Sequence, residues 1–184
     1  MKKIVLSLLA IILINISYSQ VVTNNTNTVA NYVQNVLLGG GVTVSNITFN
    51  GGPSNVANPQ FGEFTDATSS VGLSSGVILG TGDVTLASQP NIGTGTSLGG
   101  TGNSGSDPDL TAISTAGTFD EGIIEFDFIP IGDTLTFNYV FASEEYEEYV
   151  CSGYNDVFGF FLTGNNPLGG TYNAKNIALV PNPI

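Results

Sequence analysis

Two neighbouring segments alternate between apolar and polar side chains, and this period of two constrains the fold more than any other feature. They run from Ile123 to Phe128 and from Thr134 to Phe141. Successive side chains of a β-strand point to opposite faces, so each segment predicts a strand with one apolar face. The apolar faces carry Ile124, Phe126 and Phe128 in the first strand and Leu135, Phe137, Tyr139 and Phe141 in the second. Pro130 and the residues after it supply turn chemistry, which predicts an antiparallel hairpin.

Other strands are expected to be short and separated by Gly, Pro, Asn and Ser. They cover residues 42–49, 61–65, 76–80, 84–87 and 157–162. In residues 42–49 the apolar side chains change face near Ser45 and Asn46, which predicts a β-bulge there. Residues 157–162 are apolar on both faces, as in a central strand that is covered on both sides. Residues 93–106 are rich in Gly, Thr, Ser and Asn and predict a long surface loop.

One short amphipathic helix is expected near the N-terminus. Apolar side chains recur with helical spacing at Val29, Tyr32, Val33, Val36 and Leu37, and three glycines follow. We expect this stripe to pack against a sheet. Many short strands and one helix predict a mainly β fold, namely a two-sheet antiparallel β-sandwich of the jelly-roll kind. A solenoid would be the alternative, but the sequence shows no repeat period to support it.

The N-terminus has the layout of a secretory signal peptide. Lys2 and Lys3 precede an apolar run over residues 4–14, and Ser17 and Ser19 are the small residues before the expected cleavage site. The apolar run is shorter than the ~20 residues of a membrane-spanning helix, so a membrane anchor is the minor alternative. The predicted division is residues 1–19 as signal peptide, 20–28 as polar leader and 29–184 as the β-sandwich domain. We therefore expect an exported protein, either secreted or attached to the outer cell surface, with no transmembrane segment in its mature chain.

Basic side chains are nearly absent from the expected mature chain. Lys175 is the only one against fifteen Asp and Glu residues, so the formal charge is 1 − 15 = −14. Nucleic acid is excluded as a partner, because binding it needs Lys and Arg to neutralise phosphates. The chain has no histidine and one cysteine, which excludes histidine-based nucleophile systems and structural zinc. Cations, neutral sugars and basic protein surfaces remain as ligands.

Carboxylates are concentrated in two places in the second half of the chain. Asp107 and Asp109 bracket a proline in an expected loop, and Glu144 and Asp156 belong to the acidic stretch after Phe141. Ca²⁺ takes about six to eight oxygen ligands, many of them from loop carboxylates, and it is abundant outside the cell. These four acids therefore predict a calcium site, with Ca²⁺ as the one cofactor. The alternative is that they only solvate a surface that lacks basic residues, since no ligand spacing decides between the two.

The same acidic stretch predicts a ligand-binding surface of three tyrosines, Tyr146, Tyr149 and Tyr154. A tyrosine ring offers a flat apolar face with a hydroxyl at its edge, which suits stacking on sugar rings. The alternative is that these rings cap the core. Glycoside hydrolysis needs two carboxylates, and Glu144 with Asp156 is the one pairing that we retain for it. No catalytic residue is predicted beyond that alternative.

Cys151 is a single cysteine in a chain expected in an oxidising compartment. Either its disulfide partner lies beyond Ile184 or its thiol is buried and inert. The chain ends directly after an expected strand, so we expect a fragment that is incomplete at its C-terminus.

Several motifs together resemble one known family. The motifs are GVILGTG at residues 76–82, SDPDL at 106–110, FASEEY at 141–146 and YNDVFGFFL at 154–162. In combination they closely resemble the choice-of-anchor L domain of exported bacterial proteins, from about Val29 to Val180. The resemblance implies a secreted or surface-displayed protein whose anchoring or sorting segment follows residue 184. The MKK start and the SYSQ region look like those of Bacteroidetes proteins, in which a type IX secretion sorting domain often follows.

These observations predict a non-enzymatic binding or adhesion module at the cell surface, stabilised by calcium. Its expected partners are surface glycans or proteins. The alternative is a carbohydrate-active domain, either lectin-like or a glycoside hydrolase. Acids that cluster with exposed tyrosines would favour sugar binding, whereas acids wrapped by backbone carbonyls would favour a structural ion.

Overall fold

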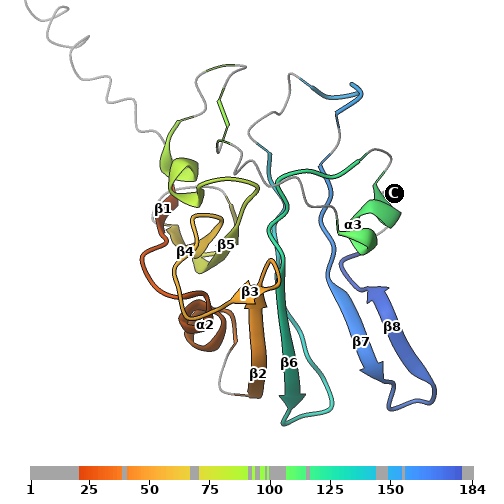
Figure 1. The fold of residues 1–184 in the computed structure, drawn as a ribbon. Coiled ribbons are helices and arrows are strands. Elements are labelled where there is room, and N and C mark those ends of the chain that lie inside the picture. Colours follow the sequence, from red (N-terminus) through yellow and green to blue (C-terminus); the bar gives the residue numbers. More distant parts are fainter. Residues whose placement is uncertain are drawn as a thin grey trace, which may run out of the picture.

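The computed structural model is mainly β, with antiparallel strands in three small sheets and short helices between them (Figure 1). It describes residues 21–38, 41–66, 71–90, 93, 96–97, 99, 107–114, 117–143, 149–154 and 156–179. The mainly β fold with a short N-terminal helix is therefore confirmed. Over these ranges, no helix combines the length and the apolar character that crossing a bilayer requires. The expected signal peptide and most of the expected loop over 93–106 lie outside the described residues.

The first sheet has the order β1-β4-β5, with β1 at Val21–Asn24, β4 at Phe61–Asp66 and β5 at Ser75–Leu79. Both pairings are antiparallel, with Val21 opposite Asp66 and Phe61 opposite Leu79. The strands predicted over 61–65 and 76–80 are thus confirmed to within a residue at each end. Gly62 lets β1 approach closely, because a Cβ at that position would overlap the backbone oxygen of Asn24.

The second sheet has the order β3-β2-β6, with β2 at Val42–Phe49, β3 at Gly52–Pro53 and β6 at Ile124–Pro130. The tight connection from β2 to β3 uses Asn50 and Gly51, whose φ angles of 48° and 69° are those that favour Asn and Gly in a two-residue hairpin. The predicted bulge in β2 is confirmed, since its pairing with β6 shifts register between Ser45 and Thr48. Asn46 occupies the bulge with φ 53°.

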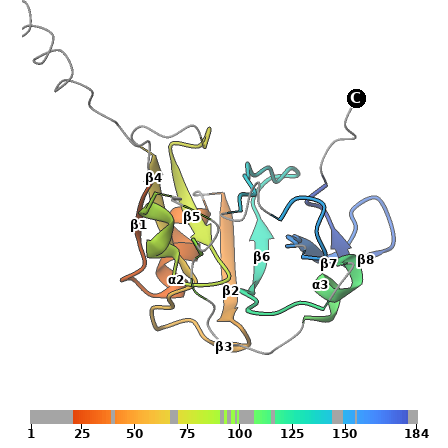
Figure 2. The same cartoon turned by 90° about the horizontal axis from the view of Figure 1, so that it is seen from above.

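The third sheet is the antiparallel pair of β7 at Phe161–Asn165 and β8 at Thr171–Asn176. A register shift between Leu162 and Gly164 places Ala174 in the left-handed region, with φ 43°. Seen from above, β2 and β6 lie between this pair and the group formed by β1, β4, β5 and α2 (Figure 2). The molecule thus has a layered part on one side of β6 and a thinner part on the other.

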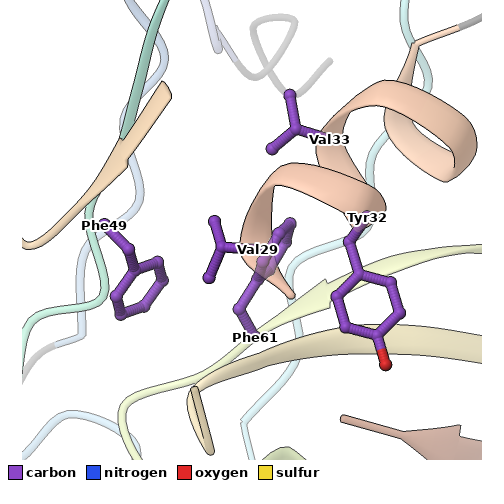
Figure 3. Packing of buried hydrophobic residues seen from close by; sticks show 5 residues of the cluster. All are labelled: Val29, Tyr32, Val33, Phe49 and Phe61. Atoms are coloured by element: carbon purple, nitrogen blue, oxygen red, sulfur yellow. The ribbon is translucent and has the colours of Figure 1, made fainter. Parts of the chain in front are cut away.

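The N-terminal helix begins where the sequence predicts. Thr28 is the N-cap of α2 at Val29–Tyr32, and its hydroxyl accepts a hydrogen bond from the Asn31 N–H. The chain then continues as a π-helix, η1, over Val33–Leu37. Five buried side chains from α2, η1, β2 and β4 form the core: Val29, Tyr32, Val33, Phe49 and Phe61 (Figure 3). The prediction that the apolar stripe packs against a sheet is therefore confirmed.

The strand predicted over residues 84–87 is wrong. Val84–Ser88 forms a 3-10 helix, η2, and Asp83 caps it by accepting hydrogen bonds from the N–H and the hydroxyl of Thr85. An acidic side chain that bonds its own neighbouring backbone favours such a turn over an extended strand. The alternation in this short window was too brief to outweigh that local bond.

The hairpin predicted between residues 123–128 and 134–141 does not form in the described chain. The first strand is confirmed as β6, but it pairs with β2, and residues 134–141 are extended without a ladder. The strand expected over 157–162 is present in part, because β7 begins at Phe161 and runs to Asn165. Its side chains are half-buried rather than enclosed on both sides.

Candidate functional site

The residues Tyr149–Tyr154 form a tight turn, here named the tyrosine turn. The Ser152 N–H donates to the carbonyl of Tyr149 at 3.0 Å, and the Tyr154 N–H donates to the hydroxyl of Ser152 at 3.1 Å. Cys151 between them has φ 61°. The turn brings the rings of Tyr149 and Tyr154 edge to face, with centroids 5.5 Å apart and planes at 81°.

Both rings of the tyrosine turn are accessible to solvent. Tyr154 is 74% exposed and Tyr149 is 37% exposed. In an edge-to-face pair only one ring has a face against its neighbour, so aromatic surface remains free for a ligand. Tyr146, the third predicted ligand-binding residue, lies outside the described residues.

Cys151 sits on the same turn with an exposed thiol that forms no disulfide with any described residue. The alternative of a buried, inert thiol is therefore wrong.

The two aspartates of the SDPDL motif begin a helix instead of lying in a loop. Asp107 is the N-cap of α3 at Pro108–Ile113, and its Oδ1 accepts from the N–H groups of Asp109 and Leu110, each at 2.9 Å. Asp109 lies in the first turn of this helix, where a negative charge is favourable. Pro108 at the first helical position fits the same start signal.

The predicted calcium ligands are not brought together in the described chain. Asp156 is exposed, Glu144 lies outside the described residues, and within the described ranges no three His, Cys, Asp or Glu side chains form a group that could hold a metal ion. The calcium site therefore stays a prediction. The pairing of Glu144 with Asp156 for glycoside hydrolysis likewise stays a prediction.

A buried polar network lies between the turn after β2, the start of β4 and the chain before β6. Gln60 is buried, and its side-chain N–H₂ donates to the carbonyls of Asp120 and Glu121 at 3.0 and 3.1 Å. The side chain of Asn50 donates to Gln60 Oε1 at 3.2 Å and accepts from the Ile123 N–H at 2.7 Å. These bonds fix where β6 begins relative to the core.

The carboxylate of Glu121 extends this network to α3. It is buried and accepts hydrogen bonds from the backbone N–H of Asp107 and, at 2.9 Å, from the hydroxyl of Thr118. A buried carboxylate needs such donors to offset its loss of water. Glu121 therefore holds the start of α3 against the segment that leads into β6, which is a structural role.

Sequence reasoning missed the burial of Glu121 and the part played by Gln60. The Asn50-Gly51 pair is the one local signal, since Asn-Gly between strands indicates a tight hairpin. Nothing around Gln60 in the sequence marks it as buried, because two of its partners, the carbonyls of Asp120 and Glu121, lie about sixty positions away.

The one positive side chain of the expected mature chain lies on β8. Lys175 Nζ is 5.4 Å from the centroid of the Tyr172 ring, a cation–π arrangement. It is far in sequence from the tyrosine turn, which therefore carries no basic neighbour of its own in the sequence.

Comparison with known proteins identifies one matching family. The choice-of-anchor L domain matches residues 20–184 of the chain. No curated protein and no solved structure matches the chain. On the strength of a match over nearly its whole length, the chain belongs to the choice-of-anchor L domain family.

Proposed function

We propose that this chain is an exported, non-enzymatic binding or adhesion module that contacts its ligand through the tyrosine turn. The observation that carries the proposal is the exposed edge-to-face pair of Tyr149 and Tyr154. Two adjacent exposed rings offer a partner a large apolar contact area with hydroxyl groups at its edge, and tyrosine is frequent at interfaces. The signal-like N-terminus and the family membership support display outside the cell.

Surface glycans are the ligand class that the turn fits best, and surface proteins are the second. A tyrosine face packs against the apolar face of a sugar ring while its hydroxyl bonds to the sugar hydroxyls. A strongly acidic chain repels anionic ligands at long range, so neutral glycans and basic proteins are favoured.

We also propose that the whole domain is a two-layer sandwich, in which the sheets form a rigid base for the tyrosine turn.

The test is binding of the mature chain to an array of neutral and acidic glycans, followed by titration of the best ligand. Tyr154→Ala should weaken binding at least about tenfold, and Tyr149→Ala by a smaller factor, as expected for loss of aromatic contacts. Phe119→Ala is the matched control, because Phe119 is an equally exposed aromatic residue on another segment. Unchanged affinity of both tyrosine variants would show that the ligand binds elsewhere.

Calcium stabilisation is a separate part of the proposal and needs its own test. The thermal midpoint of the mature chain should rise in millimolar calcium relative to chelator, and magnesium should not replace it. Asp107→Ser is the informative variant, because serine also caps a helix and so preserves α3 while removing the carboxylate. A calcium-dependent rise of unchanged size in both Asp107→Ser and Asp109→Ala would show that neither carboxylate is a required ligand.

A further inference from the structure

Residues 134–141 are extended but unpaired, although they lie between two paired regions in sequence and in space. The preceding strand, β6, has a ladder only on its β2 side within the described chain. From residue 134 to residue 142, no backbone hydrogen bond joins this segment to another described one. Figure 1 shows the segment running beside β6 and beside the chain that leads into β7.

The side chains of this segment are already in register with residues 156–160. The ring of Phe137 stacks on that of Phe160 at 4.4 Å, and Tyr139 lies against Phe158 at 5.5 Å. Moving two residues forward on one segment moves two residues backward on the other, which is the relation of an antiparallel strand pair. The spacing of two also shows that these rings share one face of each segment.

Phe160, at the end of this stretch, in turn continues the pairing of β7 with β8 by one residue. The ladder places Phe161 opposite Asn176, and one step further the Ile177 N–H donates to the carbonyl of Phe160 at 2.8 Å. The Phe160 N–H meanwhile donates to the side chain of Asn176 at 3.1 Å. The residues before Phe161 can therefore extend β7 toward its N-terminus without any change of register.

On the other side, the turn after β6 has the length of a hairpin loop. With Pro130 to Asp133 as the loop, Ile129 would stand opposite Thr134, and so Phe126 opposite Phe137. Phe126 packs against the core from β6. Phe126, Phe137 and Phe160 would then form one continuous row on one face of the sheet.

We propose that residues 134–141 close as a strand between β6 and residues 156–162, which joins the second and third sheets into one. The open arrangement leaves adjacent backbone N–H and C=O groups without protein partners, while the rings that set the register are already in contact. In the closed sheet the tyrosine turn becomes part of the connection between two paired strands. The inference rests on backbone and ring geometry and is independent of any ligand.

Amide hydrogen exchange of the mature chain, read residue by residue by NMR, tests the closure directly. A strand with neighbours on both sides has all its amides bonded, so consecutive amides from Leu135 to Val140 should exchange at least about 100-fold more slowly than those of Gly132 and Asp133. Exchange of these amides as fast as that of Gly132 and Asp133 would overturn the proposal. Protection of every second amide would also overturn it, because that pattern means pairing on one side only.

Cysteine pairs test the register in a Cys151→Ser background. Val140→Cys with Val157→Cys should form a disulfide with oxidised glutathione, because the ring contacts place these positions directly opposite. Asn138→Cys with Val157→Cys is the control, since it is displaced by two residues and should react at least about tenfold more slowly. Equal reaction of both pairs would refute this register.

Discussion

The two sides of β6 are built from the same kinds of side chain but differ in how well these are covered. On the N-terminal side, Phe61 is fully buried between Tyr32 and Phe49. On the C-terminal side, Phe137 and Phe160 stack on each other at 4.4 Å, yet Phe141, which stacks on Phe158, is 55% exposed. Aromatic side chains alone therefore do not form a buried core. They are buried only where a second layer of helix or sheet covers them.

The covering layer explains the difference. The helix that begins at Val29 and the sheet β1-β4-β5 lie over the inner face of β2, and they close around Phe49 and Phe61. In the described chain no comparable layer covers the rings of the C-terminal side. Burial of apolar area is the main source of stability, so the N-terminal side should dominate the free energy of unfolding.

Phe61→Ala should lower the free energy of unfolding more than any other substitution considered for this comparison. It removes a ring at the centre of the core and should lower the free energy of unfolding by about 3–5 kcal/mol. Phe137→Ala removes a stacked but half-buried ring and should lower it by only about 1 kcal/mol. Urea unfolding followed by fluorescence measures both. Equal losses would mean that the two sides are equally well packed.

Gly62→Ala tests how closely the strands of the covering layer approach each other. The added methyl would meet backbone atoms of Asn24, which cannot move aside as a flexible side chain can, so we expect a loss of about 3 kcal/mol. Gly41→Ala is the control, because nothing lies within 4 Å of a Cβ there. A thermal midpoint of Gly62→Ala equal to that of Gly41→Ala would contradict the close approach of β1 and β4.

Gln60→Ala probes the buried polar network that joins the core to the chain before β6. It removes the hydrogen bonds from Gln60 to the carbonyls of Asp120 and Glu121 and the one from Asn50 to Gln60, and should lower the free energy of unfolding by about 2 kcal/mol. Gln89→Ala removes an exposed glutamine and should be near neutral. The comparison would need revision if the two variants unfolded at the same urea concentration.

Ala174→Gly should give the smallest effect and the opposite sign. Alanine is unfavourable in the left-handed region, so glycine should raise the free energy of unfolding by about 0.5–1 kcal/mol after its greater flexibility in the unfolded chain is counted. Asn173→Gly, its neighbour on the same strand, should lower it instead. A lower midpoint for Ala174→Gly would argue against the bulge in β8.

Local patterns predicted most of the elements and missed most of the pairings. The helix cap at Thr28, the bulge near Ser45 and the strand β6 follow from short-range signals and are confirmed. The partner of β6 could not be read in the same way, because a hairpin with the next segment and a ladder with β2 satisfy the same alternation. The structure has the ladder with β2, in which the residues paired lie about eighty positions apart.

The candidate site shows the same difference between features predicted from short-range signals and features that depend on long-range contacts. The residues after Phe141 stand out in composition because they are rich in acids and tyrosines. Of the three predicted tyrosines, Tyr149 and Tyr154 lie on the described turn and contact each other there. Asp107 was expected in a loop, but its carboxylate caps a helix, since a proline at the next position is equally a helix start. Gln60 and Glu121 escaped notice because burial of a polar side chain depends on distant partners.

The sequence by itself determined the β-rich class, the helix at Val29 and the family, because these follow from composition, short periods and local motifs. Tertiary structure alone decided which strand pairs with β6, which rings are covered and which carboxylate is buried. Those outcomes depend on contacts between residues far apart in the chain, whose free energy is realised only when the segments meet.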